Sequence, residues 1–309
     1  MKPTLAVVIP VFNRASLVCR TLQSVAAQTV LPEHLIVVDN NSTDESFSTV
    51  REWMRKYSGP MKCTLLSEDK AGACAARNRG LRSVDTELVV FFDSDDTMRP
   101  RLVETAKKRF ADRPELKIVH WNCVLHGLDG KSRKLKHRRN AGIAFQIFHA
   151  FLRPQGYAVR KDFIDQCGGW DENLPAWNDW ELGVRMLLRN PPASGSDEIL
   201  ADIYAQEESI TGRSFSARAS RLEASLRQSA DDIAGSDLPD RDRLLRFIRL
   251  RASILSGYYA LEGSTKEAGR LLNLVAASES SRWASLIFRT AYLMTSKGLR
   301  GASSLSMLI

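Results

Sequence analysis

Three acidic residues stand together in the segment Asp93-Ser94-Asp95-Asp96, which directly follows an apolar run at residues 88–92. Carboxylates crowded at the end of a strand repel one another unless a cation joins them. Mg²⁺ and Mn²⁺ prefer oxygen ligands, and one or two carboxylates can hold such an ion while positions stay open for diphosphate oxygens. The segment would also suit a helix cap, because Asp is favoured in the first turn of a helix. Its position after a strand favours the divalent-metal site.

The elements that must position this segment alternate between strands and helices. Four short apolar runs predict strands at residues 5–9, 35–38, 63–66 and 88–92, and the first two are typical of strands buried within a sheet. Apolar residues at helical spacing predict three intervening helices, at residues 15–28, 42–57 and 73–82, the second capped by Ser42 or Thr43. This order predicts an α/β domain with a mostly parallel sheet and with ligands at its carboxyl edge.

The composition narrows the class of partner. With 44% hydrophobic and 26% charged residues, the chain of 309 residues is typical of folded globular proteins. Its net charge of +8 would suit nucleic acid, an anionic membrane surface or phosphorylated small molecules. The basic residues are not interleaved with aromatic ones, so nucleic acid is the weakest of these partners. A dense basic run at residues 131–139 is either a solvated face or a contact with phosphate or anionic lipid.

Beyond Thr211 the composition changes to Arg, Ala, Leu and Ser without strand-like runs. Helices are predicted at residues 217–230, 241–261, 265–277 and 282–296. We therefore expect two domains, at residues 1–212 and 213–309. The helices of the second combine apolar faces with many arginines, so they could pack on the first domain, pair with another subunit or lie in an anionic membrane interface.

The cysteine pattern bears on the compartment. The five cysteines lie far apart without paired spacings, at Cys19, Cys63, Cys74, Cys123 and Cys167. Such spacing argues against a disulfide framework or a zinc site and favours reduced thiols. The first apolar run is too short for a signal peptide, and no run is long enough to span a bilayer. We expect a cytoplasmic protein, peripheral to the inner face of the membrane if its C-terminal helices bind lipid.

Several ordered blocks resemble the family 2 glycosyltransferases. They are Val8–Arg14, Val37–Asp44, Gly72, Ala76–Leu81, Phe92–Asp96, Gly168–Leu174 and Asn178–Leu182. Each block alone is moderately specific, and their common order and spacing make the resemblance strong. It runs from about residue 5 to about residue 212 and does not cover the C-terminal third.

The resemblance implies a GT-A fold, in which a Rossmann-like nucleotide-binding half is fused to an acceptor half. It also implies a nucleoside-diphosphate sugar as donor, Mn²⁺ or Mg²⁺ as cofactor, inversion at the anomeric carbon and a saccharide or lipid-linked acceptor. By carry-over, Asp95 would bind the metal, Asp93 the ribose or the metal, and Asp179 would be the general base. The remaining donor-binding positions would be Pro10, Phe12 and Asn13 beside the base and ribose, Asp39 and Asn40 at the base, and Gly72, Asn78 and Ser94.

Three positions depart from the family pattern. Asn40 stands where the family often has Asp, which leaves the base open between uracil and thymine, with guanine not excluded. Asn178 precedes Asp179 where the family usually has Glu, so Glu181 or Asp171 are the next candidate bases. Gln206 stands where a His often binds the metal, and Glu207 is a candidate substitute.

Other interpretations of these residues remain open at the level of sequence. Phe12 could be core, Asp39 a turn residue, Gly72 a bend and Asp179 a helix cap. The indoles at Trp170, Trp177 and Trp180 could be core or could stack on sugars. A sugar-phosphate nucleotidyltransferase would share the fold, but it would carry a Gly-rich loop where this chain has Pro10–Asn13. An inactive sugar-binding or scaffold module is the other alternative.

Overall fold

The computed structural model describes residues 3–135, 137–206 and 214–309. The chain forms two compact units, one from residues 1–141 and 151–207 and the other from residues 142–150 and 208–309. The short segment 142–150 thus belongs with the C-terminal residues, which no feature of its sequence predicts.

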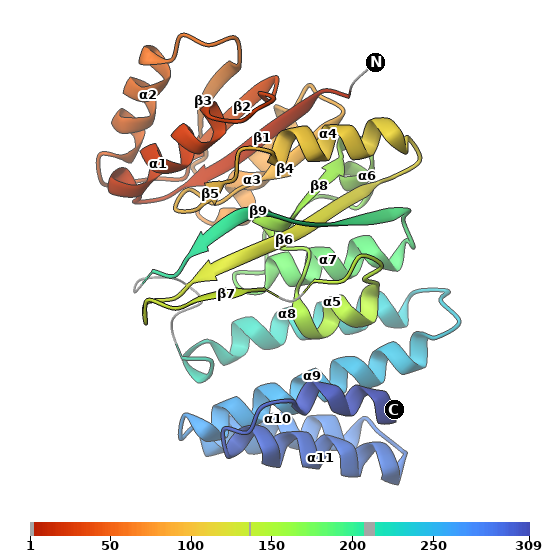
Figure 1. The fold of residues 1–309 in the computed structure, drawn as a ribbon. Helices are drawn as coiled ribbons and strands as arrows, with labels where there is room; N and C mark the ends of the chain where they lie inside the picture. Colours follow the sequence, from red (N-terminus) through yellow and green to blue (C-terminus); the bar gives the residue numbers. More distant parts are fainter. Residues whose placement is uncertain (1–2, 136, 207–213) are drawn as a thin grey trace. The chain divides into compact units, whose positions relative to one another are not determined.

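The first unit is an α/β structure built on one mixed sheet (Figure 1). The described residues contribute β1 Leu5–Val11, β2 His34–Asp39, β3 Lys62–Ser67, β4 Leu88–Phe91, β5 Thr97–Met98, β6 Ile118–His126, β7 Ser132–Lys134, β8 Tyr157–Arg160 and β9 Ala193–Tyr204. Their order is β3-β2-β1-β4-β8-β6-β9-β5, with β7 paired to β6. The half from β3 to β4 is parallel, as predicted. The other half adds antiparallel pairs of β8 with β4 and with β6, because an apolar run reports burial and not strand direction.

Helices cover both faces of this sheet. They are α1 Ala15–Ala26, α2 Ser46–Lys56, α3 Ala73–Arg82, α4 Leu102–Asp112, α6 Lys161–Gln166 and α7 Asn178–Leu188. Alternate residues of β1 (Leu5, Val7 and Ile9) join the core that α1 and α4 cover. Val8 faces α3, where a Cβ on Gly80 would lie only 2.3 Å from its side chain. Glycine at this position therefore lets α3 approach the sheet closely, and the first three strand–helix units form as the apolar pattern predicts.

The loop after β2 differs from the prediction. Helix α2 begins at Ser46, and neither Ser42 nor Thr43 caps it. The Ser42 hydroxyl instead accepts a hydrogen bond from the Asn13 backbone at 3.1 Å, and the Thr43 backbone donates to the Asn13 side chain at 2.8 Å. Capping fails at these residues because their polar groups are used to join two loops at the carboxyl edge of the sheet.

The second unit is helical. It comprises α5 Ile143–His149, α8 Ala219–Ala234, α9 Arg241–Leu261, α10 Thr265–Ala277 and α11 Arg282–Ser296, with short 3-10 turns at Ser216–Arg218 and Ala302–Leu308. The predicted bounds of the last three helices are confirmed, whereas α8 lies slightly later than predicted. Gly257 of α9 allows close packing of α11, because a Cβ there would lie 2.6 Å from Thr295. Within the described residues no helix is both long enough and apolar enough to cross a bilayer.

Candidate active site

The acidic turn after β4 is bound into the sheet by its last carboxylate. Asp96 is buried, and its side chain accepts hydrogen bonds from the Tyr204 backbone at 2.9 Å and from Gln155 Nε2 at 2.5 Å. Its carbonyl accepts one from the Thr21 hydroxyl at 2.7 Å. The turn leads into strand β5 and not into a helix, so the helix-cap interpretation of this segment is wrong.

Asp93 lies at the junction of several buried polar groups. Arg77 of α3 donates to Asp93 Oδ1 at 2.7 Å, and Gln155 donates to Oδ2 at 2.6 Å. The Arg77 guanidinium is buried and lies over the Trp170 ring at 4.4 Å from its centroid. Arg77 Nε has no hydrogen-bond partner in the described part of the chain. A buried cation with a spare donor beside an acidic turn is suited to bind an anionic ligand.

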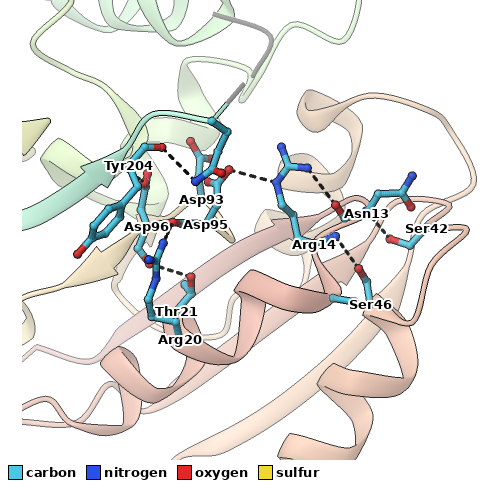
Figure 2. Close-up of polar contacts among 12 residues, drawn as sticks. Asn13, Arg14, Arg20, Thr21, Ser42, Ser46, Asp93, Asp95, Asp96 and Tyr204 are labelled. Atoms are coloured by element: carbon cyan, nitrogen blue, oxygen red, sulfur yellow. Dashed lines mark hydrogen bonds and ion pairs between the residues drawn. The ribbon is translucent and has the colours of Figure 1, made fainter. Parts of the chain in front are cut away.

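Two arginines of the first helix region contact Asp95 (Figure 2). Arg14, at the start of α1, donates from Nε to Asp95 Oδ2 at 3.1 Å, and Arg20 donates to the Asp95 carbonyl at 2.5 Å. The Arg20 guanidinium also lies over the Tyr204 ring at 4.0 Å. The arginine contacts hold the carbonyl and one carboxylate oxygen of Asp95 at the entrance of the turn.

The carboxylates of the turn disturb one another. Burial and the charge of Asp93 raise the pKa of Asp95, and the nearby Arg14 opposes this rise. Burial, followed by the charges of Asp93 and Asp95, raises the pKa of Asp96 well above its ordinary value. Each rise measures the cost of an unbalanced negative charge, which a bound divalent cation would remove.

The donor set suits a hard divalent ion. No group of three His, Cys, Asp or Glu side chains converges as a ready-made metal cage within the described residues. Mg²⁺ and Mn²⁺ need no such cage when they bind with a diphosphate, since one or two carboxylates suffice. Asp95 and Asp93 are the residues that would supply those oxygens. Gln206 donates weakly to the Tyr204 carbonyl at 3.5 Å, and its candidate substitute Glu207 lies outside the described residues.

The residues expected at the nucleotide base lie at the ends of β1 and β2. The Phe12 side chain is 55% exposed, so its interpretation as a core residue is wrong. Asp39 is buried and accepts a hydrogen bond from the Ser42 backbone at 3.2 Å through Oδ2, while Oδ1 has no partner among the described groups. Asn13 has a positive φ of 50°, and its side chain accepts a hydrogen bond from the Thr43 backbone. Pro10 lies within β1. Asp39 is thus both a turn residue and a free buried acceptor.

Three of the expected donor-binding positions are engaged within the protein. The Asn40 amide donates to the carbonyls of Glu68 and Lys70 and accepts from the Gly72 backbone, at 2.7–2.8 Å. Gly72 adopts φ 129° and ψ 140° before α3, a conformation that an L side chain rarely adopts. The Asn78 amide bonds the backbone of Trp170 in both directions and donates to Glu172. Asn40 and Asn78 therefore tie loops together through their amides, and their predicted contact with the donor stays a prediction.

Ser94 is buried between the two carboxylates that flank it in the turn. The small Ser94 side chain fits this tight turn, in which the first and last carboxylates, Asp93 and Asp96, both accept a hydrogen bond from the Gln155 amide.

Asp179 lies in the first turn of α7, half-buried among charged groups. Burial raises its pKa; the Trp180 backbone and the charges of Arg77 and Arg153 oppose the rise, and Asp93 adds to it. The preceding residue but one, Trp177, has a positive φ of 52°, a strained conformation typical of functional sites. The candidate base is therefore close enough to Asp93 for the charge of that carboxylate to raise the pKa of Asp179.

The neighbours of Asp179 have structural roles. Glu181 is fully buried and forms a bidentate ion pair with Arg185 at 2.6 and 2.9 Å, so it is not a free base. Asp171 accepts a hydrogen bond from the Asn173 backbone at 2.8 Å. Trp170 and Trp180 are buried core residues and cannot stack on a sugar, whereas Trp177 is only partly buried.

Sequence reasoning missed four residues of this site. Arg14 and Arg77 lie inside the blocks that resemble the family. Arg77 follows two alanines on a predicted helix, and this pattern was a sequence signal for a buried cation. Gln155 and Arg153 lie in and beside a short 3-10 turn at Pro154–Gly156, where no pattern marks them.

The family model described as glycosyl transferase family 2 matches residues 6–167, just over half of the chain. The chain belongs to this family. The sequence prediction of a family 2 glycosyltransferase is thereby confirmed.

Two of the solved structures that share the fold of this chain contain a bound nucleotide sugar. A crystal structure of S. aureus TarS 1-349 in complex with UDP-GlcNAc has a TM-score of 0.72 at 19% identity, covering 99% of this chain and 92% of that one. The mannosyltransferase PcManGT from Pyrobaculum calidifontis, in complex with GDP-Man and Mn²⁺, has a TM-score of 0.62 at 20% identity, covering 100% and 87%. These likenesses confirm the predicted GT-A fold.

Among curated relatives, the chain is similar to validoxylamine A glucosyltransferase from Streptomyces hygroscopicus subsp. limoneus. The two are 32% identical over 233 residues, which cover 63% of this chain and 50% of the relative. The chain thus spans about half the length of the first curated relatives that it matches.

Proposed function

We propose that this chain transfers a sugar from a nucleoside-diphosphate sugar to a hydroxyl group of a saccharide or lipid-linked acceptor, with inversion. The observation that carries the proposal is the shared environment of two carboxylates. Asp93, on the donor side, accepts a hydrogen bond from the buried Arg77, and the charge of Arg77 also acts on Asp179, on the acceptor side. Transfer needs such a pair of groups on the two sides of one reacting carbon.

The donor would lie along the carboxyl edge of the parallel half-sheet. The free Oδ1 of Asp39 can accept the ring N–H of a uracil or thymine base, and the exposed Phe12 ring can lie against its face. Asp95 and Asp93 would hold the divalent cation, which when bound supplies positive charge against the diphosphate leaving group. The UDP-GlcNAc complex of TarS and the GDP-Man and Mn²⁺ complex of PcManGT support a donor of this class.

Asp179 would act on the acceptor. Its carboxylate takes the proton of the acceptor hydroxyl as the oxygen forms a bond to the anomeric carbon. The bond from that carbon to the diphosphate oxygen breaks on the opposite side, so configuration inverts and the nucleoside diphosphate leaves. Burial helps this role, because a carboxylate with a raised pKa is a stronger base.

The first part of the basic run after β6, at residues 131–134, lies near the same edge. Its cations Lys131, Arg133 and Lys134 are exposed and form no ion pair with any described residue, whereas Arg139 pairs with Asp197. The run begins beside His126, whose ring stacks on Tyr204 at 4.8 Å next to the acidic turn. These cations support an acceptor that carries phosphate; Lys136 lies outside the described residues.

The proposal also includes a cytoplasmic location with peripheral contact at the inner face of the membrane. The cysteines are free of disulfides, which supports a reducing compartment.

The experiment that tests the donor class is a thermal-shift screen of UDP-, dTDP- and GDP-sugars with Mn²⁺ or with EDTA, because a bound donor stabilises by mass action. We expect one nucleotide class to raise the midpoint only with Mn²⁺, and the shift to vanish in Asp95→Ala. Stabilisation by a nucleoside triphosphate with a sugar phosphate would instead favour a nucleotidyltransferase. No shift with any donor would favour the inactive module.

A further inference from the structure

The outward face of α11 carries large apolar side chains. Trp283, Leu286 and Leu293 are 59%, 55% and 54% exposed, and their spacing puts them on one side of the helix. The opposite side, with Ile287, Phe288 and Ala291, is buried within the helical unit. Helix α11 therefore has two apolar faces, and only one of them is used for packing.

The C-terminal turn extends this outward face. The Trp283 indole donates from Nε1 to the Leu308 carbonyl at 3.2 Å, which joins the turn at Ala302–Leu308 to the start of α11. Met307 and Leu308 are themselves 79% and 52% exposed. We call the five residues Trp283, Leu286, Leu293, Met307 and Leu308 the α11 face.

The charge around the α11 face has one sign. Residues 280–309 contain four cations, Arg282, Arg289, Lys297 and Arg300, and no acidic residue. None of the four forms an ion pair in the described part of the chain. The arginines of α9 differ, since Arg246 and Arg249 pair with Glu279. Two of the unpaired cations, Arg282 and Arg289, thus lie on the helix that also exposes its apolar side chains, and the other two follow its last residue, Ser296.

We propose that the α11 face docks on an anionic lipid bilayer surface. An exposed indole and leucines beside unpaired cations match the two parts of that surface, the acyl boundary and the negatively charged headgroups. A second copy of the chain is a poorer occupant, because two such faces would bring eight cations together without a counter-charge. The docking deepens the peripheral membrane contact in the proposed function, for it would bring the enzyme to a lipid-linked acceptor.

Flotation of the full chain with vesicles tests the proposal. One set of vesicles contains phosphatidylcholine alone, and the other contains equal parts of phosphatidylcholine and phosphatidylglycerol. We expect flotation only with the anionic vesicles, weakening as salt rises. Because one cation near an anionic surface changes binding roughly fivefold, the triple variant Arg282→Gln, Arg289→Gln, Lys297→Gln should bind roughly a hundredfold more weakly. Trp283→Gln with Leu286→Gln should also abolish flotation.

The matched control is Leu274→Gln on α10, since Leu274 is 55% exposed like Leu286. It should float like the wild type, and it should keep the unfolding midpoint, as should the charge variant, because the changed side chains are exposed. The midpoint of Trp283→Gln with Leu286→Gln is measured as well, because this variant loses the hydrogen bond to Leu308. If the wild type floats with neither vesicle, or if the control loses binding as the α11 variants do, the proposal is wrong. A wild type that stays off vesicles but forms a dimer broken by Leu286→Gln would make the face a contact between copies. Donor stabilisation with Mn²⁺ is measured separately, so its failure would refute the catalytic proposal and leave this one standing.

Discussion

Replacing Asp179 by Asn tests the proposed base with little change in shape. The variant keeps the side-chain volume and one acceptor oxygen, but its NH₂ group replaces the other oxygen and the amide cannot take the proton of the acceptor hydroxyl. General-base catalysis contributes about 10² to 10⁴ in rate, or about 2.7–5.5 kcal/mol of transition-state stabilisation. We therefore expect turnover to fall by that factor while donor affinity and folding stay close to those of the wild type.

The pH dependence sharpens this test. Burial raises the pKa of Asp179, and the base must be deprotonated to act. Wild-type turnover should therefore fall as pH drops through that raised pKa, and Asp179→Asn should lack this acid limb. The assay is sugar transfer to a working acceptor over a range of pH.

Glu181→Gln is the matched control for Asp179→Asn. It changes a carboxylate two residues away that is buried in the ion pair with Arg185. Breaking a buried pair costs about 3–5 kcal/mol, so this variant should lose stability in urea and retain the acid limb of turnover. Wild-type turnover in Asp179→Asn, or loss of the acid limb in Glu181→Gln, would refute the assignment.

Three further substitutions in the first unit test a side-chain amide, a backbone conformation and a buried imidazole. Asn78→Ala removes three hydrogen bonds and should lower the free energy of unfolding in urea by about 2–4 kcal/mol without changing donor affinity. Weaker donor binding at unchanged stability would mean that the amide contacts the nucleotide. The added methyl group of Gly72→Ala meets no neighbouring atom, but the alanine must adopt φ 129°, so thermal unfolding should show a loss of about 1–3 kcal/mol in folding stability. An unchanged unfolding midpoint would contradict this strain. Burial beside His137 lowers the pKa of His120 to about 3 from its ordinary value of 6.5, so the free energy of unfolding is highest above pH 6.5 and falls as the pH drops toward 3. The loss should be about 2 kcal/mol near pH ~5 and absent in His120→Gln, which urea unfolding at several pH values can check.

Local sequence patterns predicted the elements whose cause is local. The runs at residues 5–9 and 35–38 became buried parallel strands, the run at 63–66 became the partly exposed parallel edge strand β3, and the helices at 241–261, 265–277 and 282–296 have the predicted bounds. Apolar periodicity reports which face is buried, which is enough to define these elements. It does not report strand direction, so the antiparallel pairs of β8 were not predictable from the pattern.

The site was predictable only where the residue type restricts the chemistry. The crowded carboxylates of Asp93, Asp95 and Asp96 pointed to the acidic turn, and its geometry excludes a helix cap. Asn40 and Asn78 were expected at the donor, and their amides bind backbone groups 28 and 92 residues away. An amide's partner depends on tertiary structure, so the sequence could not distinguish a ligand contact from a loop contact. Gln155 was missed for the same reason.

The most direct test of the central claim is release of nucleoside diphosphate from the donor that stabilises the protein. The measurement compares the wild type with Asp95→Ala, in Mn²⁺ and in EDTA, with and without a saccharide acceptor. We predict that the wild type releases diphosphate in Mn²⁺, faster with acceptor, and that EDTA or Asp95→Ala abolishes release. Release at equal rates in EDTA, or no release from any nucleotide sugar, would contradict the account of this site as a metal-assisted glycosyl transfer centre.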